Sequence, residues 1–132
     1  MMNLFAYGTL MWPEVMASVI GRRIEGVRAT LNGYQRLRVK GEHYPVVVAS
    51  EDDSVEGILY PNLTEEDFDQ LDRFEGEEYV RITVCVDGTE AQVYVLSEEW
   101  WHIAEMEAWR PEEMRPEHLA SFCAEYKGWR EV

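Results

Sequence analysis

The chain has 132 residues, enough for one domain with a sizeable core, and its hydrophobic content of 46% is typical of a globular protein. Its net charge of −14 argues against a nucleic-acid-binding protein, because contacts to phosphates require clustered Lys and Arg. No apolar run is long enough to span a membrane and no basic leader precedes one, so we expect a soluble, cytoplasmic protein.

The first expected elements are a strand and a helix, joined by a turn within the stretch LFAYGTLMWP at residues 4–13. Residues 4–7 are predicted to form a buried strand, and Pro13 to begin a helix that ends before Gly21. Two interpretations of the turn stay open at this point. Gly8 either serves a tight bend, or lets backbone N–H groups form a cradle for a ligand carboxylate beside a helix N-terminus.

Three hairpins are expected next, with turns at residues 32–33, 51–54 and 87–88. Their strands are residues 24–31 with 34–40, residues 44–50 with 55–60, and residues 79–86 with 91–96. Many short strands with helices only between and after them predict an α+β fold. We expect a small mixed, mostly antiparallel β-barrel with flanking helices.

The acidic charge is concentrated in the middle of the chain. Residues 51–78 hold twelve acids and one base, a net of −11, whereas residues 1–50 hold three acids and six bases, a net of +3. The half that contains the YGTL turn is therefore less hostile to an anionic small molecule. Most of the acidic run is interpreted as a solvated face.

The cysteines and the C-terminal segment carry little functional signal. Cys85 and Cys123 have no Cys or His neighbours at metal-ligand spacing, so we expect both to be buried in a reducing compartment, without a metal site. Residues 97–132 are rich in tryptophan and include a helix expected from Pro116 to just before Gly128. We treat residues 1–132 as a single domain with a motif-bearing core, residues 4–96, and a Trp-rich helical tail, residues 97–132.

The strongest catalytic candidate lies in the stretch NLTEEDFDQLDRFEGEEY at residues 62–79. Thr64 is a suitable N-cap, with Asp67 three residues later, and Gly76 is a suitable stop. At about 100° per residue, Glu75 falls about 20° from Phe68 on the inward face of this helix.

A carboxylate that points toward a core, at the negative end of a helix dipole, should have a raised pKa. This suits Glu75 to act as a general base that later returns the proton. The alternative at this stage is a frayed last turn, with Glu75 in water or paired with Arg81.

Together the motifs resemble the γ-glutamylcyclotransferase-like family in its compact branch, which includes the γ-glutamylamine cyclotransferases and the plant avirulence-induced-gene-2-like proteins. The similarity covers residues 4–96 and rests on four stretches in the expected order. They are FAYGTL near the N-terminus, HYP at residues 43–45, VEGILY at residues 55–60 and LDRFEGEEYVRITVCV at residues 71–86.

The resemblance implies a pocket in which the YGTL turn binds the α-amino-acid end of a γ-glutamyl group. The implied substrate-binding residues are Tyr7, Gly8, Thr9 and Leu10, with Tyr44 and Tyr79 as supporting pocket residues. Glu75 is implied as the catalytic acid/base for attack of the α-amine on the γ-carbonyl, which releases 5-oxoproline and an amine. No metal, nucleotide or other cofactor is implied, and we expect a monomer whose partner is a small γ-glutamyl substrate.

Three other readings of the sequence remain. The same chemistry could process a larger γ-glutamyl intermediate of a biosynthetic pathway, or the pocket could belong to a non-catalytic small-molecule-binding protein. The acidic residues 51–78 could instead form a protein-interaction module.

Overall fold

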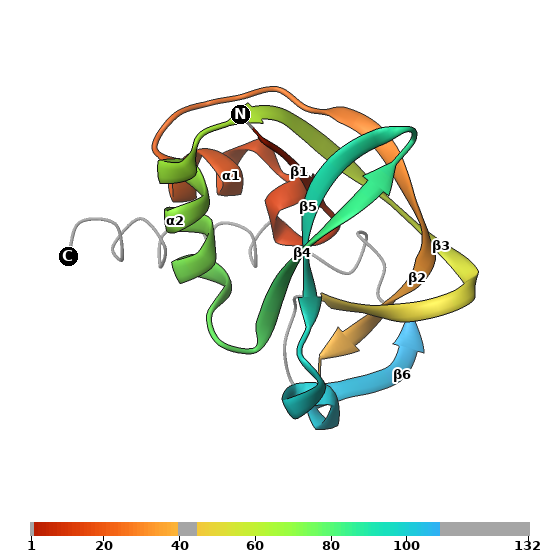
Figure 1. Ribbon diagram of the computed structural model, residues 1–132. Coiled ribbons are helices and arrows are strands. Elements are labelled where there is room, and N and C mark those ends of the chain that lie inside the picture. Colours follow the sequence, from red (N-terminus) through yellow and green to blue (C-terminus); the bar gives the residue numbers. More distant parts are fainter. Residues whose placement is uncertain (1, 40–44, 109–132) are drawn as a thin grey trace.

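One curled sheet and two α-helices position the candidate site. The computed structural model describes residues 2–39 and 45–108, and within them six strands form a sheet in the order β4-β5-β1-β3-β2-β6 (Figure 1). The strands are β1 (Met2–Ala6), β2 (Val27–Val39), β3 (Pro45–Leu63), β4 (Tyr79–Val86), β5 (Thr89–Leu96) and β6 (Ala104–Ala108). Strand β1 pairs in parallel with β5, and the other neighbouring pairs are antiparallel. The predicted mixed, mostly antiparallel sheet is confirmed.

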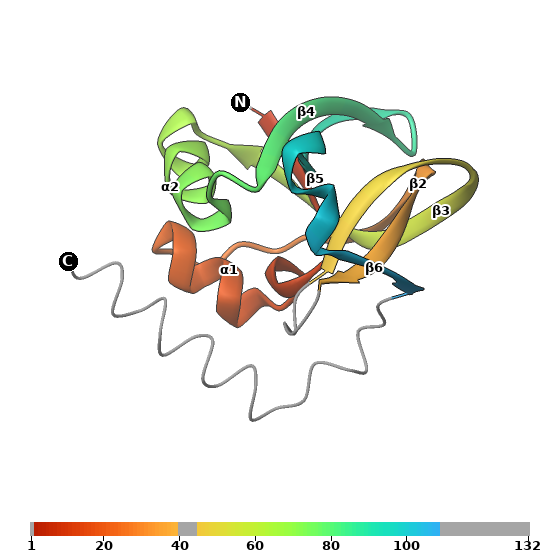
Figure 2. The same cartoon turned by 90° about the horizontal axis from the view of Figure 1, so that it is seen from below.

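The two helices lie side by side against the same side of the sheet, as both ribbon views show (Figures 1 and 2). Helix α1 (Pro13–Ile20) has its proline in the first turn and ends at Gly21, whose φ of 85° is in the left-handed region. Helix α2 (Glu65–Glu75) begins after the N-cap Thr64 and ends at Gly76. The local signals for both helices therefore predicted their bounds.

The prediction of hairpin turns at residues 32–33 and 51–54 is wrong. Strand β2 runs without reversal through Gly33, and β3 runs without reversal through residues 51–54. Asn32 pairs with Ser54 and Tyr34 with Ala49, so Gly33 on β2 faces residues 50–53 on β3 in one irregular bulge. The two turn signals thus lie opposite each other in a single antiparallel pair. Glycine at positive φ, 86° here, fits a bulge as well as a turn.

The hairpin expected at residues 87–88 is confirmed. Strands β4 and β5 pair along their whole length, with Val86 opposite Thr89. Asp87 and Gly88 have φ values of 48° and 82°, so both central residues take the left-handed conformation that a two-residue turn of this kind requires. The exposed side chain of Cys85 next to this turn corrects the expectation that it is buried.

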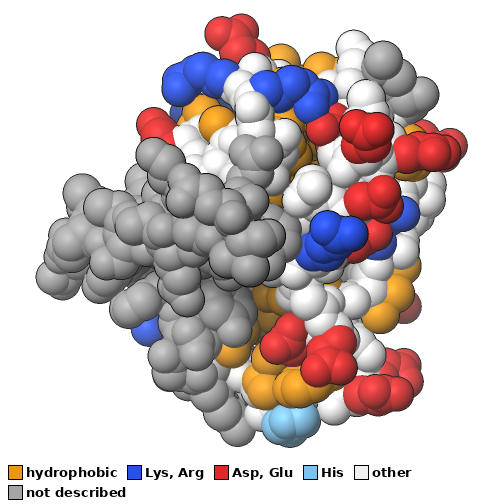
Figure 3. All heavy atoms as spheres, turned by 90° about the vertical axis from the view of Figure 1, so that its left-hand side faces the viewer, with side chains coloured by type: hydrophobic (Ala, Val, Ile, Leu, Met, Phe, Trp, Pro, Cys, Tyr) orange, Lys and Arg blue, Asp and Glu red, His pale blue; other side chains and the backbone are white. Residues whose placement is uncertain are grey.

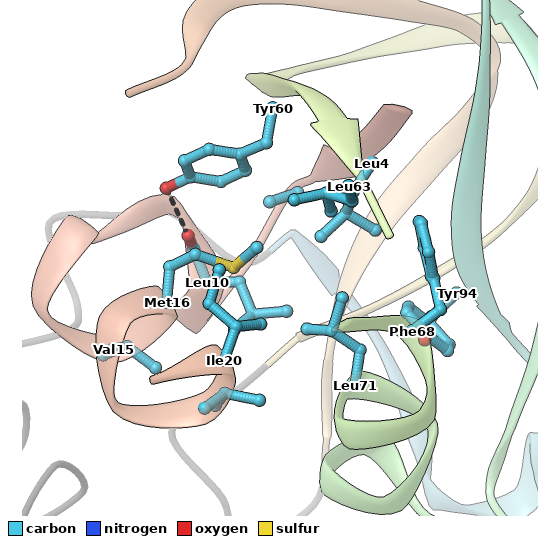
Figure 4. Packing of buried hydrophobic residues seen from close by; sticks show 12 residues of the cluster. Leu4, Leu10, Val15, Met16, Ile20, Tyr60, Leu63, Phe68, Leu71 and Tyr94 are labelled. Carbon is cyan, nitrogen blue, oxygen red and sulfur yellow. Dashed lines mark hydrogen bonds between the residues drawn. The ribbon is translucent and has the colours of Figure 1, made fainter. Parts of the chain in front are cut away.

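The core has two main parts. One lies between the sheet and the helices and includes Val15 and Met16 from α1 and Phe68 and Leu71 from α2 (Figure 4). The other lies within the curl of the sheet, where five strands contribute to a single cluster. Its fully buried members include Phe5, Leu31, Val47, Val86 and Val93. Because side chains from β1 to β5 meet in one interior, the sheet is curled into a half-barrel, and the expected barrel-like curvature is confirmed.

The segment after β5 adds a further strand to the sheet. Residues Glu98–Ile103 form a 3-10 helix with Trp101 exposed, and β6 then pairs with β2. A helical tail was expected, and the described part of the tail corrects this expectation because it contains a strand. Cys123 and the helix expected after Pro116 lie outside the described residues. In the segments that the structure covers, no helix has the length and apolar character needed to cross a bilayer.

Candidate active site

A cavity of about 230 Å³ opens between the end of β1, the turn that follows it and the C-terminal end of α2. Six of the predicted site residues line it, namely Tyr7, Gly8, Thr9, Leu10, Glu75 and Tyr79. Its lining also includes Pro45, Phe74, Glu78 and Tyr94. Residues far apart in the sequence thus meet around a single space, as the motifs had indicated. Tyr44, the remaining predicted residue, lies outside the described residues.

The turn at residues 7–10 has an asymmetric pattern of backbone hydrogen bonds. Its four carbonyl oxygens each accept one: Tyr7 O from Arg36 Nη1 at 2.8 Å, Gly8 O from Met11 N at 3.0 Å, Thr9 O from Trp12 N at 3.2 Å and Leu10 O from the Tyr60 hydroxyl at 2.7 Å. By contrast, no hydrogen bond among the described residues uses the N–H groups of Gly8, Thr9 or Leu10. All three residues line the cavity, and since polar backbone groups are normally paired, these donors are candidates for binding an anionic oxygen.

Close packing requires glycine at position 8. A Cβ atom added at this position would lie 2.8 Å from Cδ and 2.9 Å from Cγ of Pro45, closer than real Cβ contacts. The turn therefore approaches the start of β3 so closely that no side chain fits between them. This contact supports the first interpretation of Gly8, a tight bend, and the cradle for a carboxylate stays a prediction.

Glu75 occupies the last position of α2 and faces the cavity. The Gly76 N–H donates to Asp72 O over 3.1 Å, so the final turn of the helix is formed rather than frayed. Burial, and to a smaller extent the nearby carboxylates of Glu78 and Asp72, together raise the pKa of the Glu75 carboxyl group to about 8. A carboxyl group with this pKa exchanges its proton near neutral pH, as an acid/base catalyst must.

Arg81 does not pair with Glu75, which was the alternative arrangement. Its Nη1 atom lies 3.4 Å from Oδ1 of Asp72, and its guanidinium group stacks 4.7 Å above the ring of Phe68. The positive charge of Arg81 thus partly neutralises the negative charge of Asp72 rather than that of Glu75. Burial therefore remains the largest influence on the pKa of Glu75.

The acidic segment, residues 51–78, is mostly a solvated face, as expected. Nine of its twelve acidic side chains are exposed, and the three exceptions are Asp67, Glu75 and Glu78. Asp67 accepts two hydrogen bonds from Arg22 and one from the Thr64 N–H, which completes the capping box of α2. The other two line the cavity. On the face that carries the helices, acidic and basic side chains are interspersed (Figure 3).

Three tyrosines define the walls of the cavity. The Tyr7 hydroxyl donates to Tyr94 O at 2.5 Å, and its pKa is raised well above the usual value by burial and by the neighbouring Glu75. The Tyr79 hydroxyl donates to Pro45 O at 3.1 Å. Tyr94 was not predicted as a site residue, because in the sequence nothing distinguishes it from the other alternating residues of its strand. A buried tyrosine needs a partner for its hydroxyl group, and that was the only available signal.

The described residues contain no group of three His, Cys, Asp or Glu side chains that could hold a metal ion. The polar groups of the cavity are backbone N–H donors, hydroxyl groups and the carboxyl groups of Glu75 and Glu78. This combination can bind an anionic group at the turn and exchange a proton at the end of α2.

Comparison with known proteins identifies the family. The model of the family described as gamma-glutamyl cyclotransferase, AIG2-like, matches residues 4–111, so the chain belongs to this family. The match begins at the first residue of the LFAYGTL stretch and includes the whole cavity.

Relatives and solved structures support the same assignment. The chain is 34% identical to AIG2-like protein A of Arabidopsis thaliana over 130 residues, which cover 95% of this chain and 79% of the relative. It spans about half the length of several other curated AIG2-like relatives from the same plant.

Among solved structures, a solution structure from Arabidopsis thaliana matches with a TM-score of 0.71 and 29% identity, over 98% of this chain and 82% of that one. A structure named gamma-glutamyl cyclotransferase matches with a TM-score of 0.64 and 19% identity, over 96% and 80% of the two chains. The second match shows that the fold is shared.

Proposed function

We propose that the protein is a γ-glutamylcyclotransferase that releases 5-oxoproline and a free amine from a small γ-glutamyl amine or γ-glutamyl peptide. The observation that carries the proposal is the placement of Glu75, with a pKa of about 8, in the same cavity as the open N–H groups of residues 8–10. Membership of the family and the shared fold support the same class of enzyme.

The turn would bind the α-carboxylate of the substrate. Backbone N–H groups of Gly8, Thr9 and Leu10 can donate to carboxylate oxygens without a cationic side chain. The volume of about 230 Å³ is below the roughly 300–1,000 Å³ of pockets for drug-sized ligands, which suits a γ-glutamyl group.

Glu75 would then transfer the proton. Its carboxylate removes a proton from the α-ammonium group, and the resulting amine attacks the γ-carbonyl carbon, forming the new C–N bond of the ring. The bond from that carbon to the leaving nitrogen breaks as Glu75 returns the proton to that nitrogen. The ring nitrogen loses its second proton, which the released amine takes up to leave as an ammonium ion. Because nucleophile and electrophile belong to one molecule, folding the substrate into a reactive conformation supplies a large part of the acceleration.

The direct test is incubation of the protein with a panel of γ-glutamyl amines and γ-glutamyl dipeptides, followed by NMR. We expect 5-oxoproline and free amine to appear together from at least one member of the panel. Release of glutamate instead would contradict the proposal and identify a hydrolase. Thermal stabilisation by a γ-glutamyl compound without any release would identify a non-catalytic binding protein.

A further inference from the structure

We propose that Arg36 and Tyr60 are positioning residues that orient the open N–H groups of the turn at residues 7–10 toward the substrate carboxylate. This inference rests on the proposed function, because it assigns a role to residues behind the binding surface. Neither side chain lines the cavity, and each acts through a backbone carbonyl group of the turn.

Arg36 holds the first peptide of the turn from behind. It extends from β2, where it pairs with Val47 of β3, and its Nη1 atom donates to Tyr7 O at 2.8 Å and to Glu56 O at 3.1 Å. The peptide bonds of the described residues are all trans, so the Gly8 N–H points away from the Tyr7 carbonyl group. Fixing that carbonyl group toward Arg36 therefore turns the N–H of Gly8 to the opposite side.

The positive charge of Arg36 also strengthens the donor. A guanidinium group bound to a carbonyl oxygen polarises the whole peptide group, so its N–H becomes a better donor to an anion. The cationic group that assists carboxylate binding would thus lie one peptide bond behind the binding surface. Its charge would also offset the negative potential of Glu75 and Glu78, the two acidic side chains that line the cavity.

Tyr60 holds the other end of the turn. It lies on β3, is fully buried, and its hydroxyl donates to Leu10 O at 2.7 Å and weakly to Met11 O at 3.4 Å (Figure 4). Burial and the nearby Glu14 raise its pKa to about 12, so the hydroxyl group remains a donor throughout the working range of pH. Two side chains from adjacent strands thus fix the carbonyl groups at both ends of the turn.

The test uses NMR titration of the full, ¹⁵N-labelled chain with two probes. The first probe is 5-oxo-L-proline, which carries the carboxylate, and the second is its primary amide, which does not. Dissociation constants are measured from the shifts of the Gly8, Thr9 and Leu10 amide signals. The proteins compared are wild type, Arg36→Met, Arg36→Lys, Tyr60→Phe and, as a control, Arg28→Met, which removes an exposed arginine from the same strand.

We expect wild type and Arg28→Met to bind the carboxylate more tightly than the amide. Arg36→Met should weaken binding of the carboxylate about tenfold, the effect of losing one charge-assisted hydrogen bond, and leave binding of the amide nearly unchanged. Arg36→Lys should recover part of the loss, and Tyr60→Phe should weaken carboxylate binding about threefold. The spectra show in the same experiment that each variant is folded.

Two results would overturn the inference. One is an equal loss for both probes in Arg36→Met, which would indicate a structural role alone, and the other is failure of the wild-type protein to bind 5-oxoproline. Failure of the proposed enzymatic function gives a different result from failure of the positioning role. Arg36-dependent binding of the carboxylate by a protein that releases no 5-oxoproline from any substrate supports the positioning role and contradicts the enzymatic one.

Discussion

The Tyr94 hydroxyl donates a hydrogen bond of 2.6 Å to Oδ1 of Asp72, one helical turn before Glu75. The backbone carbonyl of the same tyrosine accepts the hydrogen bond from the Tyr7 hydroxyl. One residue of β5 therefore connects the turn at the end of β1 with the last turn of α2. It also holds the carboxylate of Asp72 near Glu75, where its charge contributes to the raised pKa.

The raised pKa of Glu75 predicts a specific pH dependence. A general base acts only when deprotonated, so with a pKa of about 8 the kcat/KM should rise about tenfold per pH unit below that value and level off above it. Asp72→Asn removes a negative charge near Glu75, which lowers the pKa and should shift the acidic limb of the profile to lower pH. Asp69→Asn, from the exposed face of α2, should leave it in place. A wild-type limb near pH 4.5 would show that Glu75 ionises normally.

The Arg22 and Asp67 pair should contribute to stability. Asp67 is buried and accepts hydrogen bonds from both terminal guanidinium nitrogens of Arg22. It also accepts one from the Thr64 N–H at 2.9 Å, which caps α2. Asp67→Ala should lower the free energy of unfolding by about 1–3 kcal/mol, measured by urea denaturation, since it removes a cap and a paired charge. Asp69→Ala is the matched exposed control and should change it by less than about 0.5 kcal/mol. Equal effects of the two variants would contradict the role of Asp67.

The contact between Gly8 and Pro45 predicts a non-additive pair of substitutions. Gly8→Ala should destabilise the protein by about 1–3 kcal/mol, because the new Cβ overlaps the proline ring. In a Pro45→Ala background the ring atoms are absent, so the same change should cost much less. Thermal unfolding of the four proteins measures this coupling. A cost of Gly8→Ala that is independent of Pro45 would indicate that the backbone conformation, rather than packing, requires glycine.

The substrate itself provides a further test of the chemistry. N-acetylation of the glutamyl α-amine removes the nucleophile, so an N-acetylated version of any accepted substrate should yield no 5-oxoproline. The unmodified compound, assayed beside it, is the positive control. Cleavage of the acetylated compound, with release of the amine, would mean that water rather than the α-amine attacks the carbonyl carbon.

Elements specified by local chemistry could be predicted from the sequence. Pro13 and Gly21 delimit α1, Thr64 and Gly76 delimit α2, and the turn at residues 87–88 forms as expected. Each of these signals acts within a few residues of the chain. The inward direction of Glu75 followed from the same kind of argument, since the helical period alone sets the face on which a side chain lies.

Features that depend on pairing between distant residues were not predictable in this way. Gly33 and residues 50–53 each have the composition of a turn, and only the register of β2 against β3 makes them one bulge. Likewise, nothing local to Arg36 or Tyr60 indicates that its partner is a carbonyl group of the turn at residues 7–10. These contacts arise because β1 lies between β3 and β5 in the sheet.

The measurement that tests the proposed mechanism most directly is the turnover of Glu75→Gln, which keeps the shape of the side chain and removes the base. With Asp69→Asn as the control from the exposed face of the same helix, the rate of 5-oxoproline release and the affinity for substrate are measured separately on folded protein. We expect the rate to fall by roughly two to four orders of magnitude in Glu75→Gln, with affinity changed much less and the control unaffected. Near-normal turnover in Glu75→Gln, or an equal loss in the control, would show that the catalytic group lies elsewhere.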